Sequence, residues 1–246
     1  MRIQAAIDVR TSRRKYNEQA IATDALKALE EKMDEYNRIG GFRIELITHN
    51  GEAFKGFSRS YGMIQGAQHY FGFIADTRDG FADEKIGYYG ELLVLLATTF
   101  NLGTCWIGGT FSKSKTPFKL ASHERLACLV TVGYTDVTLS KKEQFIHKLT
   151  HRKTKSTAQM SVCDITPPDW FLSGMEGVKK APSAMNKQPI VFHYKSGEVT
   201  AHIDAKIKYL AHFDLGIAKC HFELASGGGS WAWGDGVFTR HSSLTL

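Results

Sequence analysis

The chain has 246 residues, enough for one large domain or two small ones with a substantial core. Hydrophobic residues make up 43% of the sequence and charged residues 23%, a composition that excludes disorder, collagen-like repeats and a disulfide scaffold. The formal net charge of +6 suits an anionic ligand, a nucleic acid or no particular partner, and does not choose among them.

The first part of the sequence alternates helical and strand patterns. Apolar residues at helical spacing predict a helix over 24–37 that ends at the glycine pair 40–41. Alternating or continuous apolar runs predict strands over 42–48, 70–75 and 126–132. Helices and strands are therefore interleaved in this part of the chain.

One stretch, from Leu92 to Ser112, has no charged residue for 21 positions and is long enough to cross a bilayer. Threonines, an asparagine and several glycines interrupt it. We therefore predict a buried helix from Tyr88 to about Phe100, a turn, and a short strand over 104–107, with no membrane span.

A basic, polar stretch over 141–155 predicts a linker or a solvated segment. It divides the chain into an N-terminal half, 1–155, and a C-terminal half, 156–246. The second half has patterns for helices over 169–180 and about 204–214, a strand over 190–194, and two closing strands around the turn 227–229. Phe100-Asn-Leu-Gly103 and Phe213-Asp-Leu-Gly216 would each end a helix, which makes an internal duplication plausible.

The cysteines and the N-terminus indicate a cytoplasmic protein. The segment MRIQAAIDVRTSRRKY lacks the apolar run of a secretory signal. The cysteines lie far apart, without a CxxC pair or a zinc spacing, and each has apolar or small neighbours; they are Cys105, Cys128, Cys163 and Cys220. We expect buried free thiols and no metal site.

Three segments have side chains or backbone suited to binding a ligand. Arg10-Thr-Ser-Arg-Arg14, if extended, places Arg10, Ser12 and Arg14 on one face, where guanidinium groups can clamp a phosphate. The run Gly103–Phe111 contains the pair Gly108-Gly109, which lets backbone approach a ligand closely. Ala181–Pro189 (APSAMNKQP) holds polar side chains between two prolines. Each segment alone could equally be a basic loop, a tight turn or a connection.

Together, the patterns RxSxR, GTCWIGG and PSxxNxQP resemble the nitroreductase family of FMN oxidoreductases. The resemblance implies an α+β fold with central helices and mixed, mainly antiparallel sheets. It also implies bound FMN and reduction of nitro compounds, quinones or related small acceptors by NAD(P)H.

The order of the motifs differs from that of an ordinary family member. The position after the first long helix reads Met33–Phe42 and lacks PSxxNxQP, which lies in the second half instead. The second half opens with Ile165–Trp170 and lacks RxSxR. The chain therefore looks like the internally duplicated branch labelled putative TM nitroreductases, in which two tandem half-units form a pseudo-dimer. This implies one FMN per chain between the halves, and a monomer is possible.

The resemblance also assigns residues to the flavin. The positions that match the family's contacts to the phosphate and ribityl chain are Arg10, Ser12 and Arg14, and those that match its contacts to N5 and O4 of the ring are Ile107, Gly108 and Gly109. The loose match to a basic pair near the phosphate is Arg152 and Lys153. The match to the loop against the isoalloxazine comprises Pro182, Ser183, Asn186 and Gln188. Ile190 stands where the family often has Trp. No general acid stands out.

Two other functions compete with a flavin enzyme. A flavin-binding protein with little turnover would keep the same motifs. A nucleic-acid binder is disfavoured, because the basic residues are spread out and are not interleaved with aromatic residues. No GxxxxGK[ST], GxSxG or strand-linked GxGxxG motif is present, so a separate dinucleotide site is not indicated.

Overall fold

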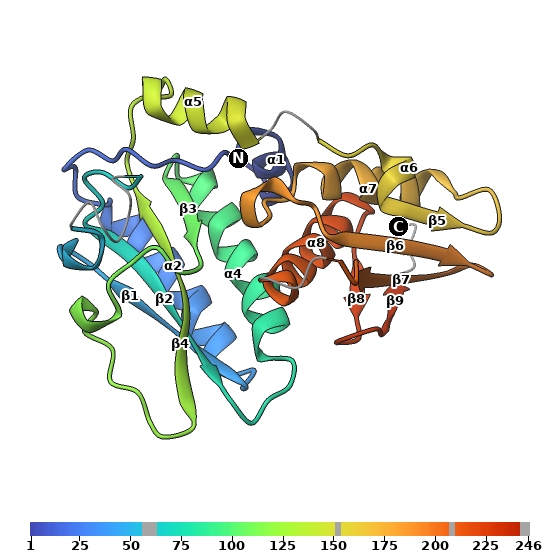
Figure 1. Ribbon diagram of the computed structural model, residues 1–246, viewed down its shortest axis with the longest axis horizontal. Helices are drawn as coiled ribbons and strands as arrows, with labels where there is room; N and C mark the ends of the chain where they lie inside the picture. Colours follow the sequence, from blue (N-terminus) through green and yellow to red (C-terminus); the bar gives the residue numbers. More distant parts are fainter. Residues whose placement is uncertain (56–62, 151–153, 207–209, 242–246) are drawn as a thin grey trace. The chain divides into compact units, whose positions relative to one another are not determined.

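The computed structural model of the chain describes residues 1–55, 63–150, 154–206 and 210–241 (Figure 1). The chain forms two compact units. Unit 1 comprises residues 1–82 and 92–152, and unit 2 comprises residues 83–91 and 153–246. The predicted mixture of helices and strands is confirmed, and the strands pair mainly antiparallel.

Unit 1 is built on a four-stranded antiparallel sheet in the order β1-β2-β4-β3. Its elements, with α4 shared between the units, are α1 (Ile3–Val9), α2 (Thr23–Asn37), β1 (Phe42–Ile47), η1 (Glu52–Phe54), β2 (His69–Asp76), α4 (Ala82–Thr99), β3 (Gly103–Ile107), η2 (Lys113–Lys115), β4 (Glu124–Gly133) and α5 (Lys141–Thr150). The strands predicted over 42–48, 70–75, 104–107 and 126–132 are confirmed to within a few residues.

The sheet of unit 1 is buried on both faces, which explains its apolar strands. On one face, Phe73 stacks on Trp106 with ring centroids 5.5 Å apart. On the other face, Tyr70 meets Phe54 and Phe118 edge to face. Gly72 lies on this second face, and the ring of Phe118 occupies the space that its side chain would need.

Helix α4 contributes to both units. Residues 83–91 belong to unit 2, and the helix then continues as part of unit 1. Leu93, Val94 and Leu95 in this second part are completely buried, which accounts for the uncharged stretch that begins at Leu92. In the described ranges no helix combines the length and hydropathy that crossing a membrane requires.

Unit 2 places α7 and α8 against a five-stranded sheet in the order β5-β6-β7-β9-β8. Its further elements are α6 (Thr157–Met160), β5 (Ser161–Cys163), α7 (Asp169–Lys180), η3 (Ala184–Asn186), β6 (Ile190–Lys195), β7 (Glu198–Ile203), α8 (Ala211–Ala225), β8 (Gly229–Trp231) and β9 (Val237–Arg240). Alternate residues of β6, namely Ile190, Phe192 and Tyr194, point into a core that includes Phe171 and Phe222.

Four strands of the five-stranded sheet repeat the topology of the four-stranded sheet. In unit 1, α2 precedes β1 and β2, and α4 precedes β3 and β4. In unit 2, α7 precedes β6 and β7, and α8 precedes β8 and β9. The strand orders β1-β2-β4-β3 and β6-β7-β9-β8 correspond, and all of these neighbouring strands are antiparallel.

Two predictions about local structure are wrong, and one is right in part. Of the two interpretations of the basic stretch after 140, the linker is wrong for Lys141–Thr150, which forms α5, and the solvated segment fits, because most residues of α5 are exposed. The helix expected over about 204–214 begins only at Ala211 and continues to Ala225, so Phe213–Gly216 lies inside it rather than at its end. Cys163 is exposed rather than buried, since it lies on the short edge strand β5.

Candidate functional site

The segment Arg10–Arg14 in unit 1 runs beside strand β3. Ser12 forms a parallel β-bridge with Thr104, and the Arg13 amide donates to the Thr104 carbonyl at 2.8 Å. Strand β3 is the last strand of its sheet, so its free edge is available to receive this segment. RxSxR and the run Ile107-Gly108-Gly109, which ends β3, are therefore tied to the same strand.

Arg13 and Glu143 anchor this segment from within unit 1. Glu143 on α5 accepts hydrogen bonds from the Arg13 guanidinium at 3.2 Å, the Arg14 amide at 2.6 Å and the Lys15 amide at 3.3 Å. Burial opposes ionisation of Glu143, but the amides of Arg14 and Ser140 with the Arg13 guanidinium outweigh it and lower the pKa to about 2. Glu143 is thus a fixed anion, and Arg13 is committed to the fold rather than to a ligand.

Arg10 and Arg14 both act on the buried thiol of Cys105 in β3. Burial raises the pKa of Cys105, and the positive charges of Arg14 and Arg10 oppose this rise. Arg10 and Arg14 flank Ser12 in the sequence, and the Arg14 guanidinium donates to the Ser12 carbonyl at 3.3 Å. Two guanidinium groups and a hydroxyl suit a phosphate dianion, since each guanidinium can donate two parallel hydrogen bonds.

The end of β3 supplies backbone rather than side chains. Ile107 is buried and pairs with Leu129 of β4, and the chain then bends at Gly108 and Gly109. Gly109 is exposed. Because glycine has no side chain, a planar ligand could approach the backbone at this bend closely.

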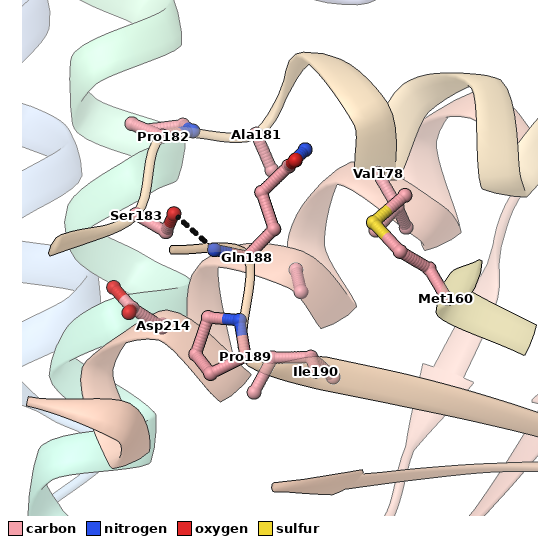
Figure 2. A pocket seen from close by; sticks show the side chains of 10 residues that line it. Met160, Val178, Ala181, Pro182, Ser183, Gln188, Pro189, Ile190 and Asp214 are labelled. Carbon is pink, nitrogen blue, oxygen red and sulfur yellow. Dashed lines mark hydrogen bonds between the residues drawn. The ribbon is translucent and has the colours of Figure 1, made fainter. Parts of the chain in front are cut away.

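The motif PSxxNxQP forms a loop in unit 2 between α7 and β6 (Figure 2). Met185, Asn186 and Gln188 have φ values of 53°, 52° and 45°, in the left-handed region that residues other than glycine rarely adopt. Such strain is found where a fold holds a functional loop in one shape. Met185 is 72% exposed, so the loop presents an apolar side chain to solvent.

Two polar residues of the motif hold the loop itself. The Ser183 hydroxyl accepts a hydrogen bond from the Gln188 amide at 2.9 Å (Figure 2). Gln188 is buried, and its side-chain oxygen accepts from the Lys155 amide at 2.8 Å. Lys155 Nζ in turn donates to the Gln188 carbonyl at 2.9 Å. Pro182 and Asn186 are partly exposed.

A small pocket of about 250 Å³, counted with its open mouth, lies under this loop. It is lined by Pro182, Ser183, Gln188 and Asp214, together with apolar residues such as Met160 and Val178. Burial raises the pKa of Asp214 to about 7, against the effect of the Ala184 amide, which donates to the carboxylate. Among the described residues, no group of three or more potential metal ligands exists.

The predicted residues therefore fall into two groups, each within one unit. Arg10, Ser12, Arg14 and the end of β3 lie together in unit 1, and Pro182, Ser183, Asn186 and Gln188 in unit 2. Arg152 and Lys153 lie outside the described residues.

Three residues that hold these groups in place were not predicted from the sequence, namely Glu143, Lys155 and Asp214. Glu143 carried a readable signal, because it is the only acidic residue between Asp136 and Asp164. Asp214 carried a weaker one, as an acid in the apolar run Phe213–Ala218.

Comparison with solved structures identifies the fold of the chain. A nitroreductase-like protein from Thermotoga maritima MSB8 shares 18% sequence identity, covers 98% of this chain and 93% of its own, and superposes with a TM-score of 0.64. A nitroreductase family protein from Clostridium novyi NT covers 59% of this chain and 92% of its own, at 17% identity and a TM-score of 0.45. A nitroreductase with bound FMN from Desulfitobacterium hafniense DCB-2 covers 56% and 92%, at 19% identity and 0.43. The first of these structures shows that the chain has a nitroreductase fold.

The amino-acid sequence identifies the family to which the chain belongs. Residues 2–226 match the family described as "putative TM nitroreductase". No curated protein sequence matches the chain. The chain belongs to the putative TM nitroreductase family, which places it among the oxidoreductases.

Proposed function

We propose that this protein is an FMN-dependent oxidoreductase that passes hydride from NAD(P)H to a nitro compound, a quinone or a related small acceptor. The observation that carries the proposal is the arrangement on β3. The segment with Arg10, Ser12 and Arg14 is bridged to this strand at Thr104, and the strand ends at Ile107, just before Gly108 and Gly109. A donor set that suits a phosphate and a backbone open to a planar ring are thus both tied to one strand.

The residues of the chain would hold the cofactor rather than react. Arg10 and Arg14 would neutralise the phosphate dianion of FMN, and the Ser12 hydroxyl would bind the phosphate or ribityl chain. The backbone at Ile107–Gly109 would donate to the ring. When bound, FMN would supply the hydride chemistry, while the protein would supply position and electrostatics. Arg152 and Lys153 remain candidates for further neutralisation of the phosphate.

We also propose that the chain is a duplicated nitroreductase unit, with half-units near 1–155 and 156–246, that holds one FMN. The corresponding strand orders of the two sheets support duplication. The division of the motifs supports a shared flavin, since RxSxR occurs in one unit and PSxxNxQP in the other. On this proposal Pro182, Ser183, Asn186 and Gln188 form the loop against the flavin ring.

Flavin binding is the first test of this proposal. We expect the protein, reconstituted with FMN and freed of excess, to show one flavin per chain by the ratio of visible to ultraviolet absorbance. Arg14→Gln should weaken FMN binding at least tenfold and leave riboflavin binding unchanged, because riboflavin lacks the phosphate. Arg38→Gln is the control, since Arg38 is an exposed residue at the end of α2. Two flavins per chain, or none, would contradict the proposal.

Turnover separates an enzyme from a flavin-binding protein, which is the second candidate. Under anaerobic conditions NADH or NADPH should bleach the bound flavin, and a quinone or nitroaromatic acceptor should restore its colour. Initial rates at several acceptor concentrations should give parallel double-reciprocal lines. A bound flavin that neither nucleotide bleaches would favour the binding protein, which keeps the same motifs without efficient turnover.

A further inference from the structure

A cluster of three lysines lies on the short helical turns η1 and η2 of unit 1, outside the residues assigned to the flavin. Lys55 directly follows η1, and Lys113 and Lys115 begin and end η2; all three are exposed. Glu52 of η1 accepts a hydrogen bond from Lys55 Nζ at 2.5 Å, and its other carboxylate oxygen lies 4.0 Å from Lys115 Nζ. Because Glu52 is the only acidic residue on the two turns, the lysine cluster has an excess of positive charge.

The core of unit 1 holds the backbone of η2 in place. Phe111 and Ser112, just before the turn, are buried, and the Ser112 amide donates to the Ala53 carbonyl of η1 at 2.9 Å. The Lys115 amide then donates to the Ser112 carbonyl at 3.1 Å and closes the turn. Ser114, between the two lysines of η2, is exposed and adds a hydroxyl. Two ammonium groups and a hydroxyl are therefore presented to solvent from one anchored turn.

The lysine cluster lies close to the backbone that the proposed function assigns to the flavin ring. Lys113 follows Gly109 by four residues, which span at most about 14 Å of chain, and both residues belong to unit 1. A dinucleotide that reduces the flavin must place its nicotinamide on the ring, and the rest of the molecule then extends away from the ring. Its adenosine end can therefore reach η2.

We propose that the lysine cluster binds the 2′-phosphate of NADPH and makes the protein prefer NADPH to NADH as its reductant. The inference rests on the proposed function, because it concerns the hydride donor of the same site. A phosphate monoester carries nearly two negative charges at pH 7, since its second pKa is about 6. Three lysines against one carboxylate leave two positive charges to match it. NADH has a neutral hydroxyl at this position and gains nothing from the cluster.

Anaerobic flavin reduction by the two nucleotides tests this preference. The wild type should have a higher kcat/KM with NADPH than with NADH. The double variant Lys113→Gln/Lys115→Gln should lower kcat/KM for NADPH by about tenfold or more and leave the value for NADH unchanged, because only NADPH loses hydrogen bonds to charged groups. The loss should lie in KM rather than kcat, since the 2′-phosphate is remote from the reacting carbon. Lys113→Arg should keep the preference, and Lys119→Gln, at an exposed lysine beyond η2, is the matched control.

Binding measurements separate this inference from its alternatives. FMN should bind the double variant as tightly as the wild type; weaker binding would mean that the lysine cluster holds the flavin phosphate, and would overturn the inference. Equal kcat/KM for the two nucleotides in the wild type, or an equal loss with both in the double variant, would overturn it as well. If neither nucleotide reduced the bound flavin, the proposed function would fail, and adenosine 2′,5′-bisphosphate would still decide the inference. This probe should bind the wild type about tenfold more tightly than the double variant, and equal affinities would overturn the inference.

Discussion

Glu143 is a buried side chain that connects two distant segments of unit 1. It joins α5 to the backbone of Arg14 and Lys15 and to the guanidinium of Arg13, residues about 130 positions earlier in the chain. The side chains of Arg13 and Glu143 are 9% and 2% exposed, so the pair is shielded from water. A buried pair is costly to break, because the remaining charge stays buried without its partner.

We therefore expect Glu143→Gln to lower the free energy of unfolding by about 3 kcal/mol at pH 7. The pKa of Glu143 is lowered from 4.5 to about 2 in the folded state, so its contribution is complete above pH 4.5 and is lost as pH falls toward 2. The difference between variant and wild type should accordingly shrink over this range. Urea denaturation followed by circular dichroism at pH 7, 4 and 2.5 measures it.

Glu30→Gln is the matched control for this experiment, since Glu30 is an exposed acid on α2. It should change the free energy of unfolding by less than about 0.5 kcal/mol at each pH. A Glu143→Gln penalty that is the same at pH 2.5 as at pH 7 would show that lost packing, and not lost charge, causes the effect.

At the scale of elements, glycines set the distance between α4 and α8. A side chain on Gly216 would collide with the Glu84 carbonyl, and one on Gly87 would collide with the Phe213 carbonyl. These collisions involve backbone atoms, which cannot move aside as a flexible side chain can. The two helix segments are thus packed with their backbones almost in contact.

Gly216→Ala should therefore lower the free energy of unfolding by at least about 2–3 kcal/mol, although alanine favours a helix interior by about 1 kcal/mol over glycine. Gly80→Ala is the comparison, because a side chain there meets no atom within 4 Å. Thermal unfolding of both variants beside the wild type gives the two differences. Equal melting temperatures for Gly216→Ala and the wild type would contradict close packing of α4 against α8.

Local patterns predicted most elements because those elements bury one face. The strand 190–194 alternates as β6 does, and 169–180 coincides with α7. Helix α8 was misplaced because Gly216 reads as a stop, whereas it is a contact with α4. Asp204, predicted to begin this helix, instead accepts from the Lys206 amide in a turn.

Helix α5 was missed because its apolar residues Phe145 and Leu149 are exposed, so it has no buried stripe. Its beginning was nevertheless encoded. The Ser140 hydroxyl accepts from the Glu143 amide at 3.3 Å, and the Glu143 carboxylate accepts from the Ser140 amide at 2.8 Å. This arrangement is the S-x-x-E capping box, which was not recognised among the neighbouring charged residues.

Only the motifs of the candidate site were predicted from the sequence. Short patterns that resemble those of a known family identified Arg10–Arg14 and Pro182–Pro189. The contacts of their supporting residues could not be recognised in this way, since Glu143 and Asp214 act on backbone that lies 129 and 30 residues away along the chain. Nothing in the local sequence of either motif specifies such a partner.

At the scale of the whole molecule, unit 2 depends on a segment that lies far from it in the sequence. Lys219 is fully buried and donates to the Glu84 carboxylate at 2.5 Å and to the Gly234 carbonyl at 2.7 Å. His221 is also fully buried and contacts Glu91 at 2.9 Å. Glu84 and Glu91 both belong to the segment 83–91 of α4, so a cut near residue 152 separates unit 2 from these two partners.

We predict that the fragment 153–246 is unfolded when expressed alone, because Lys219 and His221 would be buried without a carboxylate partner. Mixing it with the fragment 1–152 should restore dispersed amide resonances, since that fragment carries 83–91. A fragment 1–152 with Glu84→Ala and Glu91→Ala should restore them poorly. A well-dispersed ¹H–¹⁵N spectrum of 153–246 on its own would contradict the dependence, and would mean that unit 2 folds without its share of α4.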